Sequence, residues 1–259
     1  MKLINPTLLS EWITPHSLEW YRQLSEMQRE YTYAWNSTVC EPNGESIFDE
    51  KLLPLIKNKR VLDIGCGEGS FTIKCGMHSK KIVGFDVTDN FIKIGKENQK
   101  SNVSFAAGNT KNGLPFKTDV FDCAYIRKGP TSAYPHLKQV VRKGGAVLGL
   151  HPGDENGKEL SFLFPQLFEN SHGTPILDTV KQRIEKSSFS TYELETITSR
   201  EYIHSPEDVI MLRCFGQVPS VYETLIEENL LEVSKIFDEH KTKYGLPITN
   251  SRYIVRVTV

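Results

Sequence analysis

The sequence feature that most constrains the fold is a glycine-rich turn between an apolar segment and a helical one. Residues 61–71, VLDIGCGEGSF, begin with apolar side chains and then place three glycines at alternate positions. Glycine lets the backbone turn sharply and lets a ligand approach the main chain. The start of the following helix favours a negatively charged group. Several nucleotide-binding families share such a loop, so the loop alone predicts a ligand of this kind without specifying an activity.

Alternating strand and helix patterns surround this turn. Short apolar segments that fit buried strands occur at residues 59–64, 81–86, 103–107, 120–126 and 146–150. Helices are expected between them, at 90–99 and at 132–142, where Lys143-Gly144-Gly145 provides a stop signal. Short apolar strands that alternate with helices predict an α/β fold with a doubly wound, mostly parallel sheet.

The rest of the chain predicts additions to this core. Residues 1–45 are expected to form an N-terminal helical arm or cap, because Leu18, Tyr21, Leu24, Met27 and Tyr31 recur at helical spacing. Residues 46–150 form the expected cofactor-binding core, and 151–190 a cap insertion. Residues 191–259 are expected to complete the sheet, with strands at 193–202 and 251–259 and a long helix at 221–244.

Composition excludes several classes of protein. The chain of 259 residues has 31 basic and 32 acidic side chains, which rules out a uniformly basic coat for nucleic acid. No apolar run approaches the roughly 20 residues of a membrane span, and the first residues lack the apolar stretch of a secretory signal. The five cysteines form no CxxC pair and the histidines no HExxH or HxxxH pair. We therefore expect a cytoplasmic protein with no metal site and no disulfide framework.

Two carboxylates sharpen the prediction for the loop. Asp63 lies two residues before the first glycine, where it would crowd a pyrophosphate but suit a cationic ligand group or brace the loop. Asp86 ends the second strand, where a carboxylate can accept hydrogen bonds from both ribose hydroxyls. Ser70 occupies the third glycine position of the dinucleotide fingerprint, so the NAD pattern is imperfect.

These residues resemble the class I S-adenosylmethionine-dependent methyltransferases, including their type 11 group. The resemblance covers about residues 55–150 and rests on four segments in register, 61–71, 82–86, 114–124 and 140–145. It implies S-adenosylmethionine as the cofactor and a Rossmann-like sheet of seven strands with a helical cap. It also implies a set of cofactor-binding residues: Asp63, Gly65, Cys66, Gly67, Gly69, Asp86, Val87, Asn109, Thr110 and Arg127.

The resemblance also implies which part of the cofactor each of these residues would contact. The glycine loop would lie under the methionine and ribose portion, and Asp63 would face the methionine amino group directly or through water. Asp86 would hold the ribose hydroxyls, with Val87 beside the adenine. Asn109 stands where family members often have Asp, and its carbonyl oxygen can still accept from the adenine amino group.

The methyl acceptor is less constrained than the cofactor. Asn/Asp-Pro-Pro-aromatic, the motif of enzymes that methylate adenine or glutamine amides, is replaced here by Arg127-Lys128-Gly129-Pro130. His151 ends the fifth expected strand and is the best single candidate for a general base. Possible acceptor contacts are Tyr31, Tyr33, Trp35 and Lys128. We expect methyl transfer to an oxygen or nitrogen atom of a small molecule.

Two other functions remain open at the level of sequence. Residues 190–216 are similar in layout to bacterial enzymes that methylate N1 of a guanine in ribosomal RNA, although the four-cysteine zinc module of those enzymes is missing. Against RNA, residues 151–259 carry 17 acidic and 11 basic side chains. An NAD-dependent oxidoreductase or a non-catalytic cofactor-binding protein could share the same fold. The sequence does not specify the oligomeric state.

Overall fold

The computed structural model describes residues 3–169 and 172–259, which belong to two compact units. Unit 1 is made of residues 1–43, 154–173 and 198–251, and unit 2 of residues 44–153, 174–197 and 252–259. No helix in the described part of the chain combines the length and the hydrophobicity that crossing a membrane requires.

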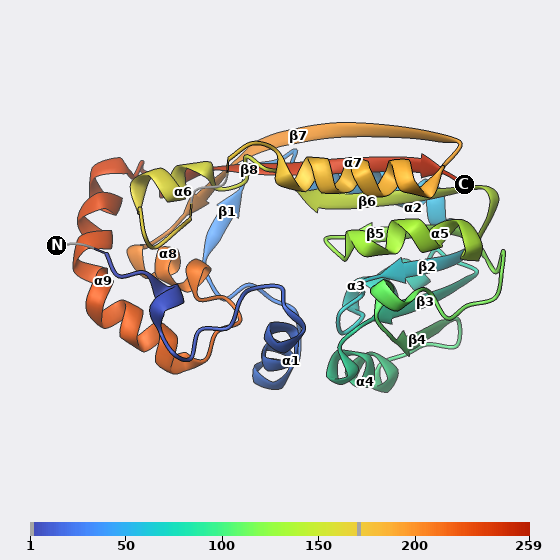
Figure 1. The fold of residues 1–259 in the computed structure, drawn as a ribbon, viewed down its shortest axis with the longest axis horizontal. Coiled ribbons are helices and arrows are strands. Elements are labelled where there is room, and N and C mark those ends of the chain that lie inside the picture. Colours follow the sequence, from blue (N-terminus) through green and yellow to red (C-terminus); the bar gives the residue numbers. More distant parts are fainter. Residues whose placement is uncertain (1–2, 170–171) are drawn as a thin grey trace. The chain divides into compact units, whose positions relative to one another are not determined.

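The described strands form one eight-stranded sheet with the order β1-β7-β8-β6-β5-β2-β3-β4 (Figure 1). Parallel pairing joins β6, β5, β2, β3 and β4, whereas β8 runs antiparallel to β6 and β1 antiparallel to β7. The strands are β1 (Ser37–Val39), β2 (Arg60–Ile64), β3 (Lys81–Asp86), β4 (Val103–Ala107), β5 (Phe121–Arg127), β6 (Val141–Pro152), β7 (Thr191–Ile203) and β8 (Leu246–Thr258). The α/β prediction is confirmed. The eighth strand is the three-residue β1, which is too short to give a periodic signal.

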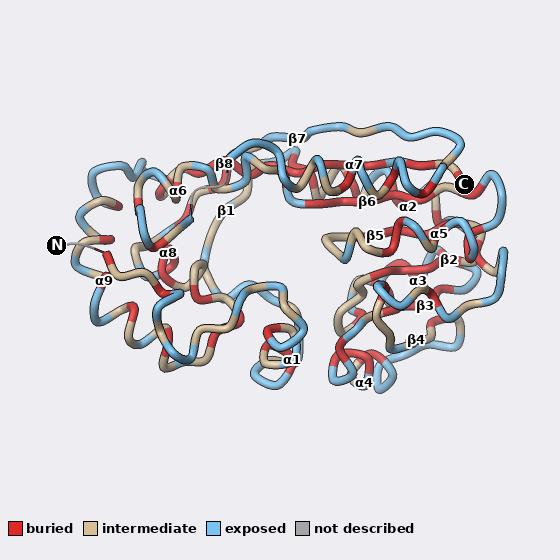
Figure 2. The backbone as a smooth tube through the Cα atoms, viewed as in Figure 1, coloured by how far each residue is buried: buried red, intermediate tan, exposed pale blue. Residues whose placement is uncertain are grey.

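Unit 2 buries both faces of its central strands, as a doubly wound sheet requires. Leu62 and Ile64 of β2 belong to one apolar cluster with residues of α5 and α7, and Val61, directly before Leu62, belongs to another with residues of α2, α3 and α4. Successive side chains of a strand point to opposite faces, so one strand contributes to both clusters. Figure 2 shows β2 buried along almost its whole length. The helices of this unit are α2 (Gly44–Ile56), α3 (Ser70–Gly76), α4 (Asp89–Glu97), α5 (Tyr134–Val140) and α7 (Pro175–Ser187), with short 3-10 turns η2 (Thr110–Asn112) and η3 (Thr131–Ala133).

Unit 1 has an apolar core of its own, built largely by helices. Its N-terminal segment is held on the turn after α8 by side-chain hydrogen bonds. The Trp20 Nε1 donates to the Phe215 carbonyl at 3.0 Å, and the Gln217 side chain exchanges two hydrogen bonds with the backbone of Ile13. The helices are α1 (Leu18–Met27), α6 (Lys158–Leu163), α8 (Pro206–Arg213) and α9 (Pro219–His240), with a 3-10 turn η1 (Pro6–Leu8).

Several element boundaries differ from the sequence prediction. The helix expected over 132–142 ends at Val140, because Val141 already pairs with Phe121 and begins β6. The expected stop signal at 143–145 therefore lies inside β6, and α9 ends at His240 instead of 244. The N-terminal helix stops at Met27, so Tyr31 is outside it.

The compact units also divide the chain differently from the segments expected. Residues 174–190 were expected in a cap insertion, but α7 lies in unit 2, where its Val180 and Ile184 are fully buried in the core. Residues 191–259 were expected to supply strands and helices that complete the sheet, and this stretch contains β7 and β8 of the sheet together with α8 and α9, which lie in unit 1. The apolar pattern of a helix predicts that one face is buried, but it does not specify which of the two cores that face joins.

Candidate functional site

The glycine loop leaves β2 in a conformation that needs glycine. Gly65, Gly67 and Gly69 have φ angles of 76°, 55° and 88°, all in the left-handed region. The start of the loop is tied to β3, because the Gly65 N–H donates to the Phe85 carbonyl at 2.8 Å. A Cβ atom at Gly65 would lie 2.7 Å from the backbone of Gly129, so the loop also approaches the segment after β5 too closely for a side chain.

Asp86 is fixed at the carboxyl end of β3 by backbone donors. The Gly67 N–H donates to its Oδ2 at 3.0 Å and the Thr88 N–H to its Oδ1 at 2.9 Å. Burial raises the pKa of Asp86, and these backbone hydrogen bonds oppose that rise. Each carboxylate oxygen can accept a second hydrogen bond. The arrangement therefore holds two acceptors in place for a ligand that carries adjacent hydroxyls.

Asp63 at the carboxyl end of β2 has one oxygen held by the protein. Both the Thr72 hydroxyl and the Tyr125 hydroxyl donate to Oδ2, at 2.6 and 2.7 Å. No hydrogen bond from a described residue reaches Oδ1. Burial is the main cause that raises the pKa of Asp63 to about 7. A cationic ligand group near Oδ1 would favour the charged form of this carboxyl.

The carboxyl ends of β3 and β4 provide the positions expected beside an adenine. Val87 directly follows Asp86 and is 36% exposed, so its side chain is accessible to a ligand. The Asn109 Oδ1 accepts from the Lys111 N–H at 2.9 Å and has one further lone pair. Thr110 is buried and its hydroxyl lies 2.6 Å from the Ser132 hydroxyl, so it braces two loops of unit 2.

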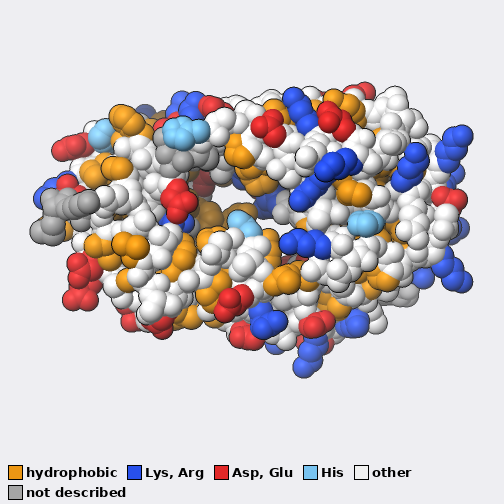
Figure 3. All heavy atoms as spheres, viewed as in Figure 1, with side chains coloured by type: hydrophobic (Ala, Val, Ile, Leu, Met, Phe, Trp, Pro, Cys, Tyr) orange, Lys and Arg blue, Asp and Glu red, His pale blue; other side chains and the backbone are white. Residues whose placement is uncertain are grey.

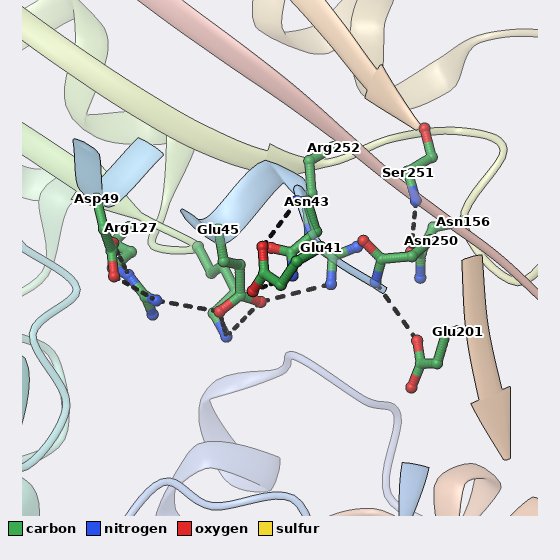
Figure 4. Close-up of polar contacts among 11 residues, drawn as sticks. Glu41, Asn43, Glu45, Asp49, Arg127, Asn156, Glu201, Asn250, Ser251 and Arg252 are labelled. Atoms are coloured by element: carbon green, nitrogen blue, oxygen red, sulfur yellow. Dashed lines mark hydrogen bonds and ion pairs between the residues drawn. The ribbon is translucent and has the colours of Figure 1, made fainter. Parts of the chain in front are cut away.

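Arg127 and Lys128 join a charged cluster that the sequence analysis did not identify. The Arg127 guanidinium pairs with Asp49 at 3.0 Å and with Glu45 at 3.1 Å (Figure 4). It also lies over the Phe71 ring, 4.5 Å from the ring centre. The Lys128 ammonium also pairs with Glu45, at 3.1 Å. The cluster fixes α2 to the end of β5, which gives Arg127 a positioning role in addition to its expected backbone contacts.

Cys66 lies within the loop, and its surroundings favour the thiol over the thiolate. Burial is the main cause that raises its pKa well above the usual value, and the nearby Asp63 and Asp86 carboxyl groups add to the shift. Its thiol donates to the Gly67 carbonyl at 3.5 Å. The sulfur therefore serves the loop and is not an activated nucleophile.

His151 lies inside β6 and not at a surface of unit 2. It is 1% exposed, and its Nε2 is 2.9 Å from the Tyr134 hydroxyl. Burial, followed by the charge of Arg183, lowers the pKa of His151 to about 3. A neutral, enclosed imidazole with a hydroxyl on Nε2 is poorly placed to take a proton from an acceptor, so the geometry does not favour His151 as the general base.

The three aromatic residues expected to contact the acceptor come together in unit 1 around Phe215. Tyr33 and Trp35 are stacked with ring centres 4.5 Å apart, and Tyr31, Tyr33 and Trp35 each meet Phe215 edge to face at 5.3–5.6 Å. Tyr33 remains 44% exposed. Phe215 follows α8 by two residues, and no sequence pattern connects it to residues 31–35.

Metal ligands do not gather in the described parts of the chain. No group of three or more His, Cys, Asp or Glu side chains within residues 3–169 and 172–259 has the arrangement of a metal site. Asp63, Asp86 and Asp122 of unit 2 instead accept from hydroxyl, backbone and guanidinium donors.

Tyr125 is the residue of this site that sequence reasoning missed most completely. It is fully buried in β5 and reads as one more large apolar residue of that strand. Its register partner on β2 is Asp63, and its hydroxyl donates to that carboxyl. The only available signal was a tyrosine in the middle of a buried strand, since a buried hydroxyl needs a partner.

Comparison with known proteins agrees with this geometry. Residues 55–160 match the family model described as a methyltransferase domain. A Paenibacillus malonyl-[acyl-carrier protein] O-methyltransferase is 23% identical over 78% of this chain and 80% of its own, and a Staphylococcus carnosus demethylmenaquinone methyltransferase is 25% identical over 57% and 75%.

A shorter match is more similar in sequence. A Methanocaldococcus jannaschii protein, provisionally named a protein N5-glutamine methyltransferase, is 40% identical over 36% of this chain, and the chain spans about half of its length (49%). Among solved structures, a Deinococcus radiodurans protein of unknown function has a TM-score of 0.61 at 19% identity, covering 93% of this chain and 97% of that one. At this identity the structural likeness concerns the fold alone.

Proposed function

We propose that this chain, a class I S-adenosylmethionine-dependent methyltransferase, transfers the methyl group to an oxygen or nitrogen atom of a small-molecule acceptor. S-Adenosylmethionine is its cofactor. The cofactor supplies a methyl group on a positively charged sulfur, which is the reacting centre. The residues of this chain have to hold that centre, orient the acceptor and dispose of the acceptor's proton.

One observation carries the proposal. Asp63 and Asp86 end two neighbouring parallel strands on either side of a glycine loop, and each keeps hydrogen-bonding capacity that the protein does not use. Asp63 Oδ1 suits an ammonium group, and the two oxygens of Asp86 suit the adjacent hydroxyls of a ribose. A pyrophosphate would meet a carboxylate at Asp63, so the pair favours S-adenosylmethionine over NAD.

The other expected cofactor residues fit the same ligand. Val87 would contact the adenine ring and the Asn109 carbonyl oxygen would accept from its amino group. Arg127, which Asp49 and Glu45 hold in place, would present its backbone to the methionine end. The three glycines of the loop adopt left-handed angles, which residues with a side chain resist.

Methyl transfer depends chiefly on alignment, because it is an in-line displacement at one carbon atom. Lys128, which directly follows Arg127 at the end of β5, is our candidate for an acceptor contact in unit 2. The aromatic group Tyr31, Tyr33 and Trp35 is a separate candidate surface within unit 1. Tyr33 is 44% exposed and stacks on Trp35, so an acceptor that carries a ring could pack against this aromatic group. One relative is named an O-methyltransferase, which supports oxygen as the acceptor atom.

The distribution of charge favours a small acceptor over RNA. Unit 1 carries 18 acidic and 9 basic side chains, and unit 2 carries 14 acidic and 22 basic ones. Acidic side chains are visible along α9 in Figure 3. Unit 1 would repel a polyanion such as RNA. The basic side chains of unit 2 are spread over several helices and turns, where they can be solvated. RNA methylation is therefore not favoured.

Binding measurements with two nucleotides test the proposal. Isothermal titration calorimetry should show one site for S-adenosylhomocysteine and no heat with NADH. Filter binding with ribosomal RNA fragments at two salt concentrations should show only weak binding, on the order of 10⁻⁴ M. Binding of NADH without S-adenosylhomocysteine would refute the cofactor assignment. Tight RNA binding that weakens steeply with salt would instead refute the small acceptor.

A further inference from the structure

The Asp63 carboxyl is held asymmetrically inside unit 2. Its Oδ2 accepts two short hydrogen bonds, from the Thr72 hydroxyl at 2.6 Å and from the Tyr125 hydroxyl at 2.7 Å. Thr72 belongs to α3 and Tyr125 to β5, so two different elements fix one oxygen. Oδ1 accepts no hydrogen bond from residues 3–169 and 172–259, and it is not among their buried side-chain atoms that lack a partner. Oδ1 is therefore the oxygen that remains accessible to a ligand.

The Tyr125 hydroxyl is placed as a permanent donor to this carboxyl. Tyr125 is fully buried and is the register partner of Asp63 on the neighbouring strand. Its ring is held edge to face by Phe48 and Phe71, with ring centres 6.5 and 5.9 Å away. Burial is the main cause that raises the pKa of Tyr125 well above its usual value, so the hydroxyl keeps its proton. A phenylalanine would fill the same space, so the packing of β5 does not need the hydroxyl, whereas Asp63 does.

The other titratable groups around Asp63 do not replace these hydroxyl donors. Burial raises the pKa of Asp63 to about 7, the two hydroxyl hydrogen bonds oppose that rise, and the charge of Asp86 adds to it. Burial also keeps the thiols of Cys66 and Cys75 protonated, because it raises the pKa of both. Arg127 lowers the pKa of Asp63 from a distance, but its guanidinium is already paired with two carboxylates of α2. The Thr72 and Tyr125 hydroxyls are thus the direct side-chain donors that favour the ionised carboxyl.

We propose that Tyr125 is a positioning residue of the cofactor site. Its hydroxyl, together with that of Thr72, turns Oδ1 of Asp63 towards the ligand and favours the ionised carboxyl that an ammonium group of the cofactor requires. When the carboxyl is protonated, the proton resides on Oδ1, because Oδ2 already accepts two hydrogen bonds. An ammonium N–H would then meet an O–H, so Asp63 has to lose this proton to solvent as the cofactor binds. The proposal rests on the methyltransferase function.

The pH dependence of S-adenosylhomocysteine binding to Tyr125→Phe tests the proposal. The substitution keeps the ring and removes one hydrogen bond to the carboxylate, which moves its ionisation upward by about one pH unit or more. Calorimetry should therefore show roughly tenfold weaker binding than to the parent at about pH 6, and a difference that shrinks as the pH rises towards about 9. Damage to the packing alone would instead weaken binding by the same factor at every pH.

Two kinds of control separate the hydroxyl from the fold. Tyr134→Phe is the matched variant, because Tyr134 is also a fully buried tyrosine of unit 2, but its hydroxyl lies 2.9 Å from the His151 Nε2. This variant should keep the pH profile of the parent. Thr72→Val should show the same shift as Tyr125→Phe, whereas Thr72→Ser, which keeps a hydroxyl, should not. Circular dichroism at each pH should confirm that the variants are folded.

Each outcome of these titrations decides one question. A folded Tyr125→Phe variant with the pH profile of the parent would overturn the proposal. If Tyr125→Phe does not fold, the Thr72 variants decide, and equal profiles of Thr72→Val and Thr72→Ser would overturn it. A parent whose affinity is the same from about pH 5 to 9 would overturn it as well. Failure of the parent to bind S-adenosylhomocysteine at any pH would instead refute the methyltransferase function.

Discussion

Replacement of Asp86 by alanine should weaken cofactor binding through loss of a charged acceptor. The carboxyl group is held by the Gly67 and Thr88 N–H groups, so both of its oxygens are in place before the ligand arrives. A hydrogen bond to a charged group contributes about 1.5–3 kcal/mol. Two ribose hydroxyls at the lower figure give about 3 kcal/mol, which corresponds to roughly a hundredfold change in the dissociation constant.

Calorimetry with S-adenosylhomocysteine measures this change directly. Asp122→Ala is a suitable control, because Asp122 also belongs to the parallel sheet but pairs with Arg60 and Arg142 at 2.9 and 3.1 Å, near the start of β5. The control should lose some stability and keep the parent's affinity. Circular dichroism should confirm that both variants are folded.

The reasoning would be refuted by an Asp86→Ala variant that is folded and binds S-adenosylhomocysteine within about threefold of the parent. Such a result would remove the ribose contact from Asp86, since even one lost charged hydrogen bond corresponds to at least about tenfold. An equal loss in the Asp122→Ala control would show that damage to the sheet, and not a missing ligand contact, causes the effect.

Three further predictions concern the loop, the pH dependence and metals. Gly67→Val and Gly144→Val each place a branched residue at positive φ, and each should lower the free energy of unfolding by about 1–2 kcal/mol. Only Gly67→Val should abolish S-adenosylhomocysteine binding, and equal binding by both variants would contradict a role of the glycine loop in holding the cofactor. The pKa of Asp63 in the folded protein is raised to about 7, so the ionised fraction of Asp63 increases with pH up to about 7. The affinity for a ligand with an ammonium group should therefore fall by up to about tenfold for each pH unit below about 7. Asp63→Asn should abolish this pH dependence. Excess EDTA should leave turnover unchanged, and a loss that one metal ion restores would contradict this.

The raised pKa of Asp63 also has a consequence for stability. Since the folded protein holds this proton more tightly than the unfolded chain, Asp63 stabilises the fold most at low pH. Its contribution declines as the pH rises from the unfolded value near 3.8 towards 7. An ammonium group bound beside Asp63 would favour its ionised form and would therefore lower this pKa.

The sequence by itself determined the core of this protein. Val61 and Leu62 alternate between two buried faces, and the glycines at 65, 67 and 69 permit left-handed angles that other residues resist. Both properties are local, since they depend on the period of a strand and on the backbone of single residues. For the same reason the amino-acid pattern alone was enough to place Asp63 and Asp86 at the ends of strands.

The tertiary structure decided which side chains meet. Tyr125 reaches Asp63 because β5 and β2 are neighbours in register, and Asn250 reaches Glu201 across 49 positions of sequence. The same holds for His151, whose place at a strand end suggested a base but whose packing against Tyr134 encloses it. A local pattern gives the period and ends of an element, whereas the partner of a polar side chain depends on strand order and register, which are set by distant parts of the chain.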